Sequence, residues 1–166
     1  MNDINIRDAK LEDIPVIQEL AELVWWPTYS PILEKEQIRF MLDKIYSVET
    51  LTRAMTDGSQ HFILLKDEKG YQGFASYGAR TEDAAIYKLH KLYVDPRNQG
   101  KGYGKILIND IRRRLQDQGI QTLDLNVNRY NTAKSFYEKL GFVVIKEEDV
   151  AIGPYWMNDF VMRLKL

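Results

Sequence analysis

The stretch QGKGYGK, residues 99–105, places three glycines at alternate positions directly before a helical pattern. Glycine is conformationally costly, so this spacing predicts a backbone that turns sharply or approaches a ligand closely. A predicted strand ends before the stretch and a predicted helix begins in it, and free N–H groups and the positive end of the helix dipole converge at such a junction. We therefore predict a site for an anion, and a phosphate-bearing ligand in particular.

Two familiar phosphate loops are excluded by the residues at fixed positions. A P-loop needs Ser or Thr after its Gly-Lys pair, but Ile106 follows Lys105. The dinucleotide-binding fingerprint needs glycine at position 105, where this chain has lysine. The stretch is therefore an anion site of another kind, or, as the alternative, a glycine-rich surface turn that binds no ligand.

The residues around the glycines predict a mixed order of strands and helices. Upstream, helical spacing covers residues 14–24, 32–46 and 48–55, and strand patterns cover 4–10, 61–67, 71–80 and 84–94. The segment 25–31 (WWPTYSP) is expected to interrupt the first helix before helical spacing resumes. Downstream, Leu107, Ile108, Ile111 and Leu115 form the apolar stripe of a helix; a strand (122–127), a helix after Asn131 (133–140) and strands (142–152, 159–166) follow. This order predicts one α/β or α+β domain, residues 1–166, with a mixed sheet flanked by helices.

Composition excludes several classes of function. Lys and Arg number 23 against 24 Asp and Glu, so no strong positive field favours nucleic acid or an anionic membrane as partner. No apolar run approaches the roughly 20 residues of a membrane span, and the first residues lack a secretory signal, so we expect a cytoplasmic protein. With no cysteine and only His61 and His90, disulfides, a cysteine nucleophile and a metal site are not expected.

Two segments carry a resemblance to a known family. LYVDPRNQGKGYGKILI (92–108) resembles the acetyl-CoA-binding motif of the GNAT N-acetyltransferases, Gln/Arg-x-x-Gly-x-Gly/Ala, which here is Gln99, Gly102 and Gly104 with an additional Gly100. LDLNVNRYNTAKSFYEKLGFVV (123–144) resembles the second signature of that family, a strand, an asparagine and a helix with a tyrosine before Leu-Gly-Phe. The resemblance implies the GNAT fold, a twisted, mostly antiparallel sheet of about six to seven strands flanked by helices.

The resemblance also implies where acetyl-CoA would bind. Backbone N–H groups would wrap the pyrophosphate, and the backbone of a strand would pair with the pantetheine arm as an added strand would. Asn131 would hydrogen-bond the cofactor; the plain alternative for it is a helix N-cap. The residues so implicated are Leu92, Tyr93 and Val94 on the strand, and Gln99, Gly100, Lys101, Gly102, Tyr103, Gly104 and Lys105 at the pyrophosphate.

Acetyl transfer to an amine sets chemical requirements of its own. The amine must lose a proton before it attacks the thioester, and the departing thiolate must gain one. Tyr137 stands where the family keeps a tyrosine general acid, and His90, four residues before Val94, is the candidate base. Tyr137 as core, His90 as a structural histidine, and residues 147–149 (Glu-Glu-Asp) as the base are the alternatives. Without a cysteine nucleophile, direct transfer within one ternary complex is expected.

The acceptor is predicted from aromatic residues near the ends of the chain. Trp26, Tyr29 and Tyr155 are the candidate acceptor-binding residues, and core packing is the alternative for each. The aromatic segment and the strand KLHKLYV (88–94) are similar to those of bacterial polyamine-type acetyltransferases, so a small primary amine or polyamine is expected. The alternatives are a protein N-terminal or lysine acetyltransferase and a non-catalytic coenzyme A sensor. The oligomeric state stays open, a homodimer included.

Overall fold

The computed structural model describes residues 3–98 and 100–166, and a seven-stranded sheet forms its centre. The strand order is β1-β2-β3-β4-β5-β7-β6, and every neighbouring pair is antiparallel except β4 and β5, which run parallel. The predicted mixed, mostly antiparallel sheet is thereby confirmed. The strands are β1 (Asn5–Asp8), β2 (His61–Asp67), β3 (Gly70–Ala79), β4 (Ile86–Val94), β5 (Thr122–Asn128), β6 (Val143–Ile152) and β7 (Tyr155–Lys165).

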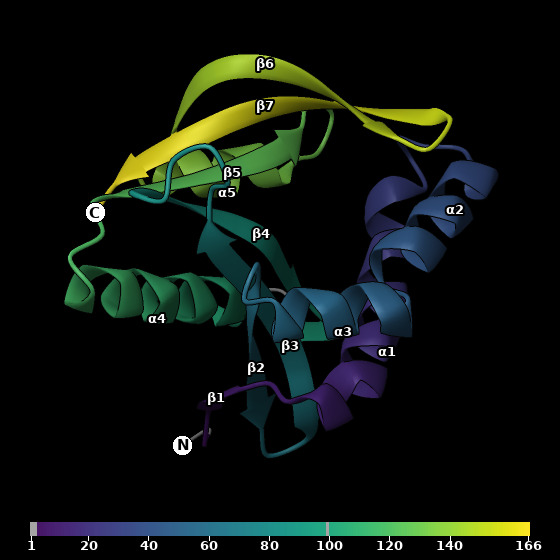
Figure 1. The fold of residues 1–166 in the computed structure, drawn as a ribbon. Coiled ribbons are helices and arrows are strands. Elements are labelled where there is room, and N and C mark those ends of the chain that lie inside the picture. The colour runs from purple at the N-terminus through teal and green to yellow at the C-terminus, as the bar shows by residue number, and fades with distance from the viewer. Residues whose placement is uncertain (1–2, 99) are drawn as a thin grey trace.

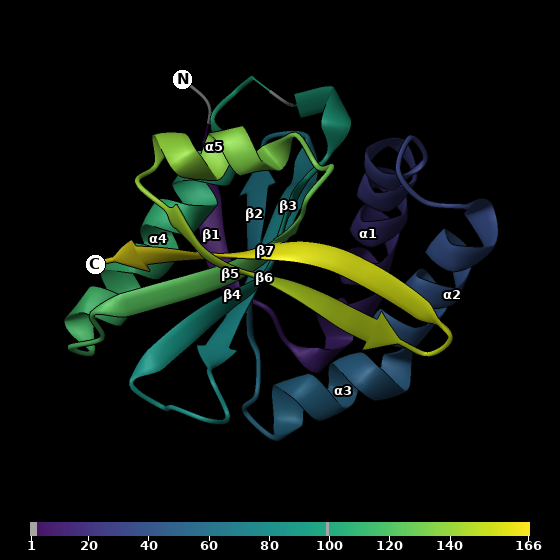
Figure 2. The same cartoon turned by 90° about the horizontal axis from the view of Figure 1, so that it is seen from above.

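Helices cover both faces of this sheet. One layer consists of α4 (Tyr103–Asp117) and α5 (Ala133–Lys139). The other consists of α1 (Ile14–Tyr29), α2 (Lys35–Ile45) and α3 (Val48–Thr56), and Figures 1 and 2 show the sheet passing between the two layers. Short 3₁₀ turns, Leu11–Asp13 and Pro96–Asn98, precede α1 and the glycine stretch.

Strand alternation divides the interior into two hydrophobic cores. Ile63 and Leu65 of β2 pack with α4 and α5, whereas Phe62 and Leu64 of the same strand pack with α1, α2 and α3. Successive side chains of a strand point to opposite faces, so an uninterrupted apolar run supplies both cores. The predicted stripe of α4 is confirmed, since Leu107, Ile108, Ile111 and Leu115 are fully buried.

The interruption predicted within residues 25–31 is confirmed, and it falls after Pro27. α1 continues through Pro27 and ends at Tyr29. A proline inside a helix removes the hydrogen bond to the carbonyl four residues earlier, here that of Leu23. Leu23 is exposed, and Pro27 lies in the last turn, so the helix loses little by tolerating it.

β4 has a bulge at the point where its pairing with β5 ends. Leu89 and Leu92 pack in the same core although they are three residues apart, because the pairing with β3 shifts register between Ser76 and Tyr77 and leaves His90 as the extra residue of β4. The parallel pairing with β5 ends at Leu89 and Leu125. Beyond this point β4 and β5 separate.

The hairpin of β6 and β7 reaches across to α2. Gln37 donates a hydrogen bond from Nε2 to the backbone oxygen of Trp156 (3.0 Å), and the rings of Phe40 and Tyr155 are 5.3 Å apart. Figure 1 shows the turn of this hairpin beside α2. The hairpin therefore joins the α1–α3 layer to the far edge of the sheet.

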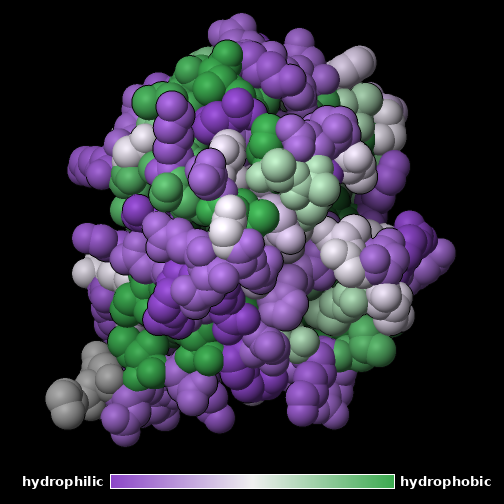
Figure 3. Space-filling model, turned by 60° about the vertical axis from the view of Figure 1, so that its left-hand side comes forward, coloured by the Kyte–Doolittle hydropathy of each residue, from purple (hydrophilic) through white to green (hydrophobic). Residues whose placement is uncertain are grey.

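The outer surface carries mixed polar and apolar groups. On the face in Figure 3, hydrophobic residues gather in small groups among hydrophilic ones. Val143, Val144 and Ile145 of the edge strand β6 are among the exposed apolar residues. In the ranges 3–98 and 100–166, no helix combines the length and the apolar character needed to cross a bilayer.

Candidate active site

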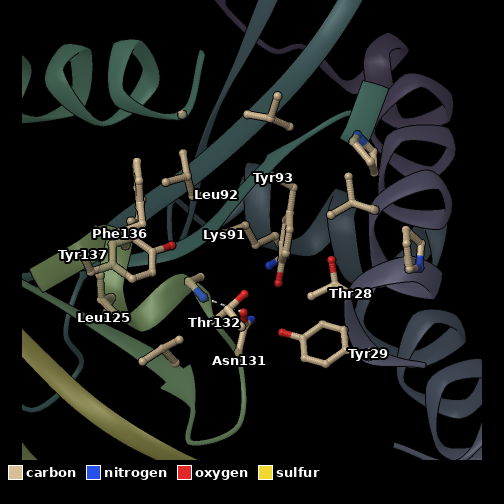
Figure 4. Close-up of a pocket in the computed structure, with 18 of the residues that line it drawn as sticks. Thr28, Tyr29, Lys91, Leu92, Tyr93, Leu125, Asn131, Thr132, Phe136 and Tyr137 are labelled. Carbon is tan, nitrogen blue, oxygen red and sulfur yellow. Dashed lines mark hydrogen bonds between the residues drawn. The ribbon is translucent and has the colours of Figure 1, made fainter. Parts of the chain in front are cut away.

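A cavity of about 890 Å³ lies where β4 and β5 separate. Its walls come from the ends of these strands, the N-terminus of α4, one side of α5 and the C-terminal turn of α1, and Figure 4 shows side chains from these elements directed into it. Cavities of this size bind small molecules or cofactors. The predicted anion site and the predicted catalytic tyrosine thus face one shared space.

Gly102 starts α4 in a conformation that favours glycine. Its φ is +78°, in the left-handed region, and the first helical hydrogen bond runs from the N–H of Ile106 to the oxygen of Gly102 (3.0 Å). The N–H groups of Tyr103, Gly104 and Lys105 therefore have no acceptor within the helix. These groups and the positive end of the helix dipole lie at the cavity wall, where they could hold an anion.

Gly104 leaves space at the cavity wall between the side chains of Phe136 and Val94. A Cβ built there would lie 3.5 Å from Cζ of Phe136 and 3.9 Å from Cγ2 of Val94, both of which line the cavity. Those are ordinary contact distances, so the protein itself does not require glycine at this position. A glycine here fits a ligand whose phosphate approaches the helix backbone, as the pyrophosphate of coenzyme A would.

Most of the predicted cofactor residues line the cavity together. Lys101 is not among the lining residues, and its Nζ donates a hydrogen bond to Oδ1 of Asn98 (3.0 Å). Gln99 lies outside the described residues. The side chain of Tyr103 is buried, so only its backbone can serve a ligand. The predicted residues that line the cavity are Leu92, Tyr93, Val94, Gly100, Gly102, Tyr103, Gly104, Lys105 and Asn131.

Tyr137 lies in the cavity wall with its hydroxyl directed toward the side of Leu92 (Figure 4). Its ring packs against Phe136 and Phe142, with centroids 5.3 and 5.7 Å away. Burial, and to a lesser degree the neighbouring Tyr29, raises the pKa of Tyr137 well above its usual value. The hydroxyl therefore stays protonated at neutral pH, as a proton donor must.

His90 also lines the cavity, but its surroundings are cationic. The residue is exposed to solvent. Desolvation, with the positive charges of Lys88, Lys91 and Arg80, lowers the pKa of His90 to about 3. The ring is therefore neutral at pH 7 and can accept a hydrogen bond, but it is a weaker base than a histidine of ordinary pKa near 6.5.

Three polar groups meet on the α1 side of the cavity. The hydroxyls of Tyr29 and Tyr93 and the side chain of Asn131 point toward one another (Figure 4). Asn131 also holds the start of α5, because its Oδ1 accepts a hydrogen bond from the N–H of Ala133 (2.9 Å). The residue directly before the helix is Thr132, so Asn131 caps it from one position further out.

The predicted acceptor residues do not share one site. Tyr29 lines the main cavity, whereas Trp26 and Tyr155 line a separate groove between α1, α2 and the β6–β7 hairpin. Trp26 donates a hydrogen bond from Nε1 to Glu22 (2.7 Å), and Arg39 stacks on its ring. The structure thus brings Tyr29 to the predicted catalytic groups and places Trp26 and Tyr155 elsewhere.

Two carboxylates lie behind Asn126, a cavity residue that the sequence did not indicate. Nδ2 of Asn126 donates to Oε1 of Glu148 (3.3 Å) and to Oδ2 of Asp159 (3.2 Å). Its Oδ1 is buried and has no hydrogen-bond partner within the described residues. Burial raises the pKa of Asp159. Burial also raises the pKa of Tyr29, with smaller contributions from Tyr93 and Asp159.

The other two acidic residues proposed as alternative bases are engaged elsewhere. Arg129 lies 2.9 Å from Oδ1 of Asp149 and 3.8 Å from Oε2 of Glu147. Across residues 3–98 and 100–166, no three His, Cys, Asp or Glu side chains gather as they would around a metal ion.

Known acetyltransferases resemble this chain over part or nearly all of its length. The family model for the acetyltransferase (GNAT) domain matches residues 29–164. A spermidine N(1)-acetyltransferase from Thermoplasma acidophilum is 28% identical over 167 residues, which cover 98% of this chain and 97% of that protein. The ribosomal protein bS18-alanine N-acetyltransferase of Haemophilus influenzae is 37% identical over 70 residues, which cover 42% of this chain and 46% of that protein.

A solved structure extends the comparison to three dimensions. The PaiA N-acetyltransferase from Thermoplasma acidophilum, crystallised in complex with coenzyme A, superposes with a TM-score of 0.83. The two chains are 30% identical, and the alignment covers 99% of each. The likeness therefore includes the helices and the hairpin that surround the cavity as well as the sheet.

Proposed function

Because this chain belongs to the GNAT acetyltransferases, and so uses acetyl-CoA as its acetyl donor, we propose that its acceptor is a small primary amine, and a polyamine in particular. The proposal includes direct transfer, in which donor and acceptor are bound together and no acetyl-enzyme forms. The chain has no cysteine to carry an acetyl group. That the chain forms a single domain and is cytoplasmic stays a prediction, and its oligomeric state stays open.

The cavity suits the donor in an extended form. Pyrophosphate would accept hydrogen bonds from the N–H groups at the start of α4, where Gly102 and Gly104 leave room. The pantetheine arm would pair with the backbone of residues 92–94, along the edge of β4 that β5 leaves after Leu89. This placement brings the thioester to the part of the cavity where Tyr137 and His90 lie.

Tyr137 and His90 then take the two proton-transfer roles. The neutral ring of His90 would accept the proton of the acceptor amine, directly or through a water molecule, before attack on the thioester carbonyl. The backbone N–H of Leu92 would stabilise the oxyanion that forms. Tyr137 would donate its proton to the departing thiolate, since burial keeps the hydroxyl protonated until that charge develops.

The observation that carries the polyamine proposal is the polar group formed by Asn126, Asp159 and Glu148. A protonated amine is a cation with several N–H donors, so it needs acceptors and negative charge. Asn126 lines the cavity, its buried Oδ1 has no hydrogen-bond partner within the described residues, and its Nδ2 contacts two carboxylates. The rings of Tyr29 and Tyr93 add surfaces that attract a cation. The full-length similarity to a spermidine acetyltransferase supports the same acceptor class.

A panel of acceptors tests this proposal. Release of coenzyme A thiol is measured with acetyl-CoA and, in turn, spermidine, an uncharged-tail monoamine of equal length, and peptides with free N-terminal or lysine amines. We expect kcat/KM for spermidine to exceed that for the monoamine by about tenfold or more, because the remote ammonium gains the contacts near Asp159. A higher kcat/KM for the peptides than for spermidine would contradict a polyamine function and favour protein acetylation.

Removing the imidazole tests the role of His90. In His90→Ala we expect turnover to fall by about 10- to 100-fold, and the acid limb of its pH profile to move to higher pH, because the amine must then deprotonate unaided. The low pKa of His90 means that its own protonation should not produce an acid limb above about pH 5. An unchanged pH profile would leave His90 with a structural role and make Glu148 the next candidate base, since it contacts the cavity residue Asn126.

A further inference from the structure

Asp67, at the end of β2, is a buried carboxylate that lies outside the cavity. Its Oδ2 accepts a hydrogen bond from the hydroxyl of Tyr103 (2.7 Å), and its Oδ1 accepts from Nε2 of Gln72 (3.1 Å) and the N–H of Lys69 (2.8 Å). The Tyr103 hydroxyl is the main cause of the lowered pKa of Asp67, so the carboxylate is ionised at neutral pH. A buried charge held by three donors fixes the position of its partners firmly.

The same network continues to the other end of the glycine stretch. Oε1 of Gln72 accepts a hydrogen bond from Nδ2 of Asn98, and the backbone oxygen of Gln72 accepts from the N–H of Asp95 (2.8 Å). Asn98 precedes the glycines and Tyr103 follows the second of them. Both ends of the loop are therefore attached to one point, the hairpin of β2 and β3.

Gly100 and Gly102, which lie between these attachments, have open space around their α-carbons. Gly100 and Gly102 both have positive φ, +90° and +78°, and a Cβ built at either would meet no atom within 4 Å. Glycine backbone without packed side chains has many accessible conformations, and ordering it on binding costs conformational entropy. Anchors at the two ends reduce this cost before a ligand arrives.

We propose that Asp67 and Tyr103 are positioning residues for the donor: they hold the glycine loop in the shape that directs the first N–H groups of α4 toward the pyrophosphate of coenzyme A. The proposal rests on the placement of pyrophosphate given under the proposed function. Neither side chain touches the cavity with its polar atoms, because the hydroxyl of Tyr103 is engaged by Asp67 in the buried network. Their effect on binding is transmitted through the backbone at Asn98 and Tyr103, to which the network is attached.

Tyr103→Phe tests the proposal, because it keeps the buried ring and removes only the hydroxyl. We expect the dissociation constant for coenzyme A, measured by calorimetry on the folded variant, to rise about tenfold, as the loss of one charge-assisted hydrogen bond predicts. Asp67→Asn, which keeps the shape of the side chain, should weaken binding in the same direction. The matched control is Tyr71→Phe in the same hairpin, whose hydroxyl interacts with Arg7 of β1 and not with the loop; its affinity should equal that of the unaltered protein.

A donor that lacks the pyrophosphate separates positioning from general destabilisation. With acetyl-CoA, kcat/KM of Tyr103→Phe should fall about tenfold, while with S-acetylpantetheine it should stay within about twofold of the unaltered protein. Equal losses with both donors, or an unchanged affinity for coenzyme A, would overturn the proposal. Gly102→Val separates a failure of the pyrophosphate placement from a failure of the positioning role. If Gly102→Val also leaves the affinity for coenzyme A unchanged, the placement of pyrophosphate is wrong. If Gly102→Val weakens binding and the Tyr103 and Asp67 variants do not, only the role of Asp67 and Tyr103 is wrong.

Discussion

Replacing Tyr137 by phenylalanine is expected to lower turnover by about 10- to 10⁴-fold while acetyl-CoA affinity changes little, the range usual for loss of a general acid. The ring keeps its contacts with Phe136 and Phe142, and the hydroxyl has neighbours in the cavity rather than in the core. Steady-state kinetics with calorimetric binding of coenzyme A measures both quantities. Since the pKa of Tyr137 is raised, its ionisation should also cause no fall in rate below about pH 10.

Tyr87→Phe is the matched control for this substitution. Tyr87 lies on β4, is partly buried against the same core and does not line the cavity. We expect its turnover to equal that of the unaltered protein. Full activity in Tyr137→Phe would show that Tyr137 is a core residue, and an equal loss in both variants would show that the effect comes from packing.

Two glycine substitutions in the loop should have different effects on stability and the same effect on binding. Gly102→Val places a β-branched residue at φ +78°, which costs about 1–3 kcal/mol of folding free energy and distorts the start of α4. Gly104→Ala meets only ordinary contacts, and alanine favours a helix by up to about 1 kcal/mol over glycine, so its stability should be unchanged or higher. Both should bind coenzyme A at least about tenfold more weakly, because the added atoms alter the surface that receives pyrophosphate.

Gly119→Ala serves as control, because it also has positive φ (+76°) and lies beyond the other end of α4. It should lower stability by about 1 kcal/mol and leave coenzyme A affinity unchanged. Thermal unfolding and calorimetry on the same samples give both quantities. Unaltered affinity in Gly102→Val and Gly104→Ala together would remove the anion site from this loop.

Local patterns in the sequence were sufficient to predict the elements that form the cavity. The glycines between a strand and an apolar-striped helix predicted the junction, and β4, α4 and β5 lie where their periodicity indicated. Such patterns depend on neighbours along the chain and need no knowledge of the tertiary structure. The continuation of α1 through Pro27 was missed, because the cost of a proline depends on whether the freed carbonyl reaches water.

Features that depend on distant segments could not be predicted in this way. The bulge at His90 exists only relative to β3, and the low pKa of His90 depends first on desolvation and then on the charges of Lys88, Lys91 and Arg80. Tyr103 meets Asp67, 36 residues earlier, for which no local signal exists. Trp26 and Tyr29 are close in sequence, yet they line different hollows, because Tyr29 packs on Trp25 toward the sheet while Trp26 turns toward Arg39 of α2.

The central claim is that acetyl passes directly from acetyl-CoA to a small amine while both occupy the cavity of β4 and β5. Initial rates measured with acetyl-CoA and spermidine varied against each other, with mass spectrometry of protein and polyamine at each stage, test it most directly. We expect intersecting double-reciprocal lines, acetylated spermidine and no acetylated enzyme intermediate, because the chain has no cysteine to carry the group. Parallel lines with a transient acetyl-enzyme, or coenzyme A release without acetylated spermidine, would contradict the account.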